Sequence, residues 1–174
     1  MNIFYLDKNP KASAEMHVDK HVSKMLVEYA QLMSTSHRVC DGTKIQKLNK
    51  IGRKMTTYTH PNMETDLYKS CHVNHPSNIW LRQSIENYEW LYEMWLCLHK
   101  EFQIRYGKDH MSYVKLKKVL KNPPVNCTNS AFTQPLQAMP DDVKDTDSVV
   151  AYRNYYRKYK KHIATWKTEV PAWY

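Results

Sequence analysis

Scarcity of glycine is the feature that most restricts the folds open to this chain. Its 174 residues include only three glycines, Gly42, Gly52 and Gly107. Glycine supplies positive φ angles in tight turns and lets a backbone approach a phosphate closely. Glycine-built phosphate loops, dinucleotide-binding folds and turn-rich β-barrels all need several such positions. The composition therefore argues against these architectures and favours a helical fold.

Two long segments repeat their apolar residues with the period of a helix. The first begins at Asn9-Pro10 and continues to about residue 37. The second begins at Pro76 and continues to residue 106, where Gly107 is placed to end it. The chain therefore contains two long predicted helices, each opened by a proline in its first turn.

The remaining segments are shorter. Residues 1–6 form an apolar extended arm or a strand, and residues 41–75 form a long loop with short helical pieces. A basic helix is predicted over 111–120, and Asp147 can cap a last helix that reaches about residue 167. These segments predict one compact all-α, or nearly all-α, domain over residues 1–174 with a short N-terminal extended arm.

The charge balance points to a polyanionic partner. Lysine and arginine total 26 against 17 acidic residues, a formal net charge of +9. Such an excess favours nucleic acid, most simply DNA, although a merely basic surface is the alternative. No apolar run approaches the length of a membrane span and no secretion signal opens the chain, so we expect a cytoplasmic protein, in the host cytoplasm if a phage encodes it. The four cysteines form no CxxC pair and are expected to be reduced thiols.

A narrow polar stripe follows the first predicted helix, whose remaining surface is largely apolar. At 100° per residue, one face collects His17, His21, Lys24, Glu28, Gln31 and Thr35. Two histidines in register with a glutamate and a lysine suit proton transfer, with an ordinary solvated face as the alternative. We therefore expect His17, His21, Lys24 and Glu28 to be catalytic residues that line a cleft.

Metal binding is a second interpretation of the same histidines. His17 and His21 are four residues apart, and His72 and His75 could add further ligands. The HExxH signature is absent, however, and Lys24 would repel a cation. We therefore expect neither a metal nor another cofactor.

Phosphate-binding residues are expected in two places. His75 and Arg82 lie at the start of the second long helix, where backbone N–H groups favour anions. On the last helix, a basic face without an acidic residue suits contact with phosphates, with a solvated face as the alternative. This face consists of Arg153, Arg157, Lys160 and Lys161.

Two stretches resemble a known family. Residues 21–39 (HVSKMLVEYAQLMSTSHRV) resemble a helix of the pyrimidine-dimer DNA glycosylases of the endonuclease V type from T-even phages, in which a His, a Glu-Tyr pair and a Leu occur at similar spacing. Residues 74–107 resemble the next long helix of bacterial relatives, which also opens with His-Pro. Residues 1–7, 17–25 and 151–174 also resemble uncharacterised small proteins of tailed phages. The resemblance covers about half of the chain.

The resemblance implies an all-α enzyme that cleaves an N-glycosidic bond of damaged DNA through an imine, with Glu28 as the matching carboxylate. In the family, the nucleophile is the α-amine of a small second residue that is exposed when the first methionine is removed. Residue 2 here is Asn, whose bulk normally leaves Met1 in place. The nucleophile would then be the Met1 amine or the side chain of Lys24.

The leading hypothesis is accordingly a phage-type DNA-directed enzyme, either a base-excision glycosylase and abasic-site lyase or a related base-processing enzyme. A small-substrate enzyme of nucleotide metabolism could use the same polar stripe. A non-enzymatic DNA- or RNA-binding accessory protein would carry it as mere polar surface.

Overall fold

A computed structural model describes residues 1–174 and is mostly helical, with one small sheet. The α-helices are α1 (Pro10–Glu15), α2 (Asp19–Cys40), α3 (Pro76–Arg82), α4 (Ile85–Tyr106), α5 (Met111–Leu116) and α6 (Ser148–Tyr159). Two short 3-10 helices, η1 (Asp141–Val143) and η2 (Lys161–Ile163), lie on either side of α6 in the sequence. The strands β1 (Thr43–Leu48) and β2 (Lys54–Thr59) form the sheet.

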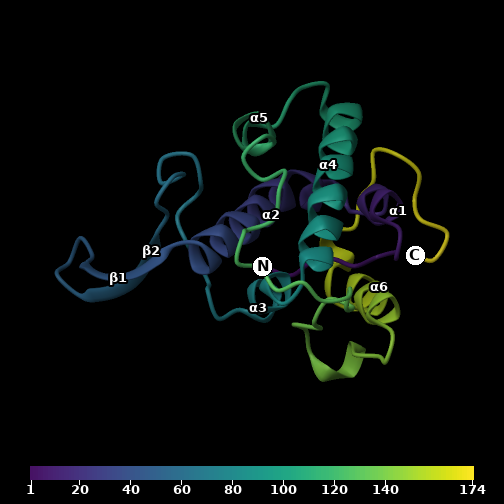
Figure 1. Ribbon diagram of the computed structural model, residues 1–174. Coiled ribbons are helices and arrows are strands. Elements are labelled where there is room, and N and C mark those ends of the chain that lie inside the picture. Colours follow the sequence, from purple (N-terminus) through teal and green to yellow (C-terminus); the bar gives the residue numbers. More distant parts are fainter.

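The long helices α2 and α4 cross at the centre of the molecule (Figure 1). Each has 22 residues, and the buried Trp95 of α4 donates its indole N–H to the carbonyl oxygen of Leu26 on α2 at 2.9 Å. The N-terminal arm is extended, as predicted, and residues 3–6 are buried in the same core. Its Phe4 N–H donates to the hydroxyl of Tyr29 at 3.1 Å, which fixes the arm along α2.

Both long predicted helices are interrupted. The first breaks at residues 16–18, because the buried Arg105 of α4 donates to the carbonyl oxygens of Glu15 and His17 at 2.8 and 2.7 Å. The second breaks at Ser84, which caps α4 by accepting from the N–H of Glu86 at 3.1 Å. A tertiary contact and a local cap thus divide segments whose periodicity alone predicts continuous helices.

The expectation of a long loop over 41–75 is wrong for residues 43–59, and the fold is therefore not strictly all-α. β1 and β2 pair antiparallel in a register that sets Thr43 opposite Thr59 and Leu48 opposite Lys54. The strands are largely exposed, so they lack the apolar alternation that identifies a half-buried strand. Their threonines and β-branched residues, and Gly52 at φ 76° in the turn, were the available signals.

Other boundaries follow the sequence more closely. Gly107 ends α4 in the left-handed conformation at φ 67°, as predicted. Asp147 caps α6 by accepting from the N–H of Val149 at 2.7 Å, also as predicted. However, α5 and α6 end at residues 116 and 159, before the predicted 120 and 167. None of the helices combines the length and apolar character needed to span a membrane.

Candidate active site

Two amines converge on one carboxylate beside the N-terminal arm. The amino group of Met1 lies 3.8 Å from Glu28 Oε2, and Lys24 Nζ lies 3.2 Å from Glu28 Oε1. The side chain of Met1 is 7% exposed, that of Glu28 is 17% exposed and that of Lys24 is 65% exposed. The carboxylate therefore bridges the amine of a residue whose side chain is buried and the amine of an exposed lysine.

This group faces a small hollow of about 200 Å³ with an excess of positive charge. Its lining adds Lys160, at the end of α6, to the two amines and Glu28. Lys160 Nζ lies 4.9 Å from the centre of the Tyr155 ring, which also lines the hollow. Three cations against one carboxylate suit a negatively charged ligand such as a sugar phosphate.

The extended arm is what brings Met1 to this position. Burial of residues 3–6 anchors the arm, and the Asn2 side chain donates to the carbonyl oxygen of Ala138 at 2.9 Å. Lys24 and Glu28 follow from helix geometry, because residues four apart on α2 are neighbours on its surface. The sequence identifies Lys24 and Glu28, whereas the proximity of Met1 depends on the path of the arm.

His21 contributes a neutral wall to the hollow. Its ring stacks on Phe4 with centroids 4.2 Å apart, and Nδ1 lies 2.7 Å from the hydroxyl of Tyr156. Burial lowers the pKa of His21 to about 2, and the charges of His17 and Lys160 act in the same direction. His21 is therefore uncharged at neutral pH and shapes the site.

His17 lies in the core, outside the hollow. Nδ1 lies 2.7 Å from the carbonyl oxygen of Ser13 and must donate to it, so Nε2 accepts from the hydroxyl of Tyr29 at 3.0 Å. Burial lowers the pKa of His17 to about 4. Since both ring nitrogens are occupied and His17 precedes α2, the structure separates it from Lys24 and Glu28.

Residues 70–75 form a wall that contacts the same stripe of α2 at Thr35 and lies outside the lining of this hollow. Thr35 Oγ1 accepts from the N–H of Cys71 at 3.2 Å. Burial lowers the pKa of His75. The charge of the Met1 amino group lowers this pKa further, whereas the Glu28 carboxylate raises it. The Nδ1 atom of His75 caps α3 by accepting from the N–H of Ser77 at 3.2 Å.

The wall of residues 70–75 contains one residue with a strained backbone. His72 has a φ of 47°, the left-handed region that residues other than glycine rarely adopt. The buried Asn78 side chain holds it by donating to the carbonyl oxygens of Cys71 and His72, both at 3.0 Å. Arg82, predicted to bind phosphate, donates to the carbonyl oxygen of Val73 at 3.0 Å and so supports the same segment.

The predicted basic face of α6 divides into two pairs. Arg153 donates to the carbonyl oxygen of Leu6 at 2.8 Å, and Arg157 donates to that of Trp173, so both hold other segments in place. Lys160 lines the hollow, and Lys161 is exposed. Of the four basic residues of this face, only the two lysines therefore remain available to a ligand.

A separate cluster at the end of α2 joins His37, Asp41 and His60, whose ligand atoms lie within 4.8 Å of one another. The hydroxyl of Tyr88 donates to a carbonyl, so His37 Nε2 carries a proton and Nδ1 is a buried lone pair without a partner. His60 Nδ1 accepts two backbone N–H groups, at 3.1 and 3.3 Å, which leaves the proton on Nε2. One imidazole N–H, one lone pair and one carboxylate suit a hydrogen-bonded molecule better than a metal, which needs a lone pair from each ligand.

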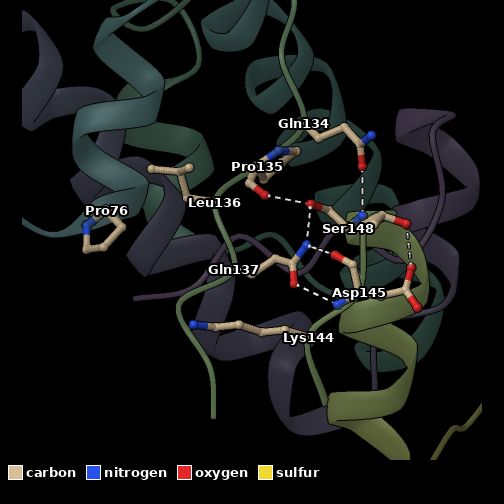
Figure 2. A pocket seen from close by; sticks show the side chains of 9 residues that line it. Pro76, Gln134, Pro135, Leu136, Gln137, Lys144, Asp145 and Ser148 are labelled. Carbon is tan, nitrogen blue, oxygen red and sulfur yellow. Dashed lines mark hydrogen bonds between the residues drawn. The ribbon is translucent and has the colours of Figure 1, made fainter. Parts of the chain in front are cut away.

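A larger hollow of about 720 Å³ lies beside the N-terminus of α6. Figure 2 shows that its polar groups are mostly bonded to each other. Gln137 donates to the carbonyl oxygen of Asp145 at 2.6 Å and accepts from its N–H at 3.1 Å, and Ser148 donates to the carbonyl oxygen of Pro135 at 2.9 Å. This junction holds the segment that carries Ala138 to the amine site.

Comparison with known proteins gives no relative. No family model matches the chain, and neither curated proteins nor solved structures yielded a match. The likeness to pyrimidine-dimer glycosylases therefore depends on the quoted residues alone.

Proposed function

We propose that this protein is a DNA-directed enzyme that forms an imine between its Met1 amine and C1′ of a deoxyribose, as a glycosylase or abasic-site lyase does. The observation that carries the proposal is the pair of amines on Glu28 in a cationic hollow. The hollow of about 200 Å³ is smaller than typical pockets for whole small-molecule ligands, so it suits a sugar whose base lies outside.

Met1 is the better nucleophile of the two amines. Its side chain is 7% exposed, whereas that of Lys24 is 65% exposed and solvated. Lys24 and Lys160 would then hold the flanking phosphates.

The chemistry balances with the groups present. On an abasic site, the amine nitrogen bonds to C1′ of the aldehyde, and the aldehyde oxygen leaves as water after receiving two protons. On an intact nucleotide, the same attack expels the base, which leaves with the electron pair of the glycosidic bond. The C1′–O4′ bond then breaks to give the imine, and O4′ takes a proton to become a hydroxyl group. Glu28 accepts the proton that the amine loses and gives it to the departing oxygen or base. As a carboxylate again, it can remove a proton from C2′, so that the C3′–oxygen bond breaks and the strand is cut.

Borohydride trapping on DNA with one abasic site tests this function. We expect a covalent adduct that peptide mapping assigns to Met1, and that persists in Lys24→Ala. Two residues added ahead of Met1 should abolish it, because they displace the amine from Glu28. Absence of an adduct in the wild type would refute the proposal, and an adduct at Lys24 would refute the assignment to Met1.

Glu28→Gln tests the carboxylate, since it keeps the shape and removes the base. We expect strand cleavage to fall at least ~100-fold with unchanged folding. The matched control is Glu93→Gln, an exposed glutamate on helix α4, which should cleave like the wild type. Equal trapping of free deoxyribose phosphate and of DNA would favour the small-substrate enzyme instead.

A further inference from the structure

The β1–β2 hairpin stands apart from the helical core. Figure 1 shows it projecting beyond the C-terminal end of α2. Each strand has six residues, and the side chain of Asn49 stabilises the turn by accepting from the N–H groups of Ile51 and Arg53 at 3.1 and 2.9 Å. Six extended residues span about 20 Å, a length comparable to the width of a DNA duplex. Such a ribbon buries few side chains, so core packing places little constraint on its sequence.

The hairpin is a concentrated positive charge. No acidic residue occurs between Asp41 and Glu64, and none of the cations in this interval forms an ion pair. These cations are Lys44, Lys47, Lys50, Arg53 and Lys54. Lysine and arginine placed this way on a two-stranded ribbon match the phosphates along a groove of duplex DNA.

Apolar side chains are exposed at the tip of the same ribbon. Leu48 is 63% exposed, Ile51 is 72% exposed and Met55 is 41% exposed. Exposed apolar groups on an unpaired ribbon favour association with the chain's own copies, unless a partner covers them. Proteins that bend DNA insert such side chains between base steps while their cations hold the backbone.

A hollow lies at the root of the hairpin. This hollow of about 750 Å³ lies between the strands, which contribute Lys44 and Tyr58, and the wall of residues 70–75. The wall includes Cys71, which bonds to Thr35 of the α2 stripe, and His75, on which the charges of Met1 and Glu28 act. A strand that lies along the ribbon would therefore reach residues 70–75, which contact the α2 stripe at Thr35.

We propose that the β1–β2 hairpin is a DNA-binding arm, whose cations contact the phosphates of a duplex and whose Leu48 and Ile51 contact its bases. The hollow at its root receives the distorted strand at residues 70–75, which contact the same helix, α2, that carries Glu28. This inference extends the proposed function and rests on it for the fate of the strand, while binding by the arm can be measured alone.

The test compares two variants with equal loss of charge. The arm variant changes Lys47, Lys50, Arg53 and Lys54 to glutamine, and the control changes Lys100, Lys108, Lys118 and Lys121, which are exposed elsewhere. We measure Kd for a 20-base-pair duplex at several salt concentrations. The arm variant should lower the slope of log K against log salt by about 2–4, at roughly 0.9 for each lost phosphate contact. The control should lower it by less than about 1. Equal slopes in both variants would overturn the proposal.

Leu48→Ser with Ile51→Ser tests the tip. We expect about 10-fold weaker binding with an unchanged salt slope, because the change removes base contacts and leaves the phosphate contacts. Unchanged affinity would refute the role of the tip, and equal affinity for a duplex RNA of the same sequence would refute the commitment to DNA.

Trapping separates this inference from the proposed function. Arm variants should still form the Met1 adduct with free 2-deoxyribose, since the amine site is intact. If the wild type forms no adduct but the arm variant loses DNA affinity, the proposed chemistry fails and the arm remains. If the wild type traps DNA and both variants bind it equally, the arm fails and the chemistry remains.

Discussion

Replacement of Arg38 by methionine should destabilise the whole protein, because this side chain joins α2 to the hairpin and to the segment that follows it. Arg38 is 2% exposed and uses every N–H of its guanidinium. Nε donates to the carbonyl oxygen of Tyr68 at 2.7 Å, and Nη1 donates to that of Tyr58 at 3.1 Å and to the Glu64 carboxylate. Nη2 donates to the carbonyl oxygens of Glu64 and Leu67 at 2.8 and 3.3 Å.

The expected loss follows from these contacts. Methionine fills a similar volume but leaves four backbone carbonyl oxygens without their donor. A buried acceptor left without its donor costs about 1–3 kcal/mol, and three of these four contacts are only partly buried, so we expect a total loss of about 3–5 kcal/mol. We discount the ion pair itself, because Glu64 is 54% exposed and water can replace it. At about 2–4 °C per kcal/mol for a chain of this size, Tm should fall by about 6–20 °C.

Urea unfolding followed by circular dichroism measures this change. The matched control is Arg53→Met, the same substitution at an exposed arginine, which should shift the free energy of unfolding by less than about 0.5 kcal/mol. Arg38→Lys should fall between them, since an ammonium has only three donors. A loss of under about 1 kcal/mol in Arg38→Met would show that the contacts of its guanidinium do not hold the hairpin to α2.

Two further predictions concern pH and the root of the hairpin. Burial lowers the pKa of His21 to about 2 and that of His37 to about 4, below the 6.5 of the unfolded chain, so the unfolded state takes up protons first. As the pH falls below about 6.5, the free energy of unfolding should therefore decrease, by up to about 1.4 kcal/mol per pH unit for each histidine. Urea unfolding at pH 7, 6 and 5 measures this decrease, which should be smaller in His21→Gln than in the wild type. Gly42→Ala should cost about 1–3 kcal/mol, because its Cβ would clash with the carbonyl oxygen of Thr59, whereas Gly52→Ala sits in open space and should cost about 1 kcal/mol from its φ of 76°. The reverse order in urea unfolding would contradict this steric explanation.

Several helix boundaries could be predicted from the sequence, because they depend on residues that are close together in the chain. Prolines in first turns, Asp147 as a cap and Gly107 as a terminator act within a few residues of their own position, so the pattern alone predicts them. The neighbourhood of Lys24 and Glu28 is equally local, because it is a property of helix geometry.

Tertiary structure decided the rest, because the deciding contacts join residues far apart in the chain. Arg105 divides the first predicted helix from 88 residues away and thereby removes His17 from the stripe. The amine of Met1 meets Glu28 only because the buried arm lies along α2. The hairpin carries little apolar alternation, since both of its faces are largely exposed, and its position at the end of α2 depends on Arg38. Sequence periodicity reports which side of a segment is buried, and it carries no information about which distant group covers that side.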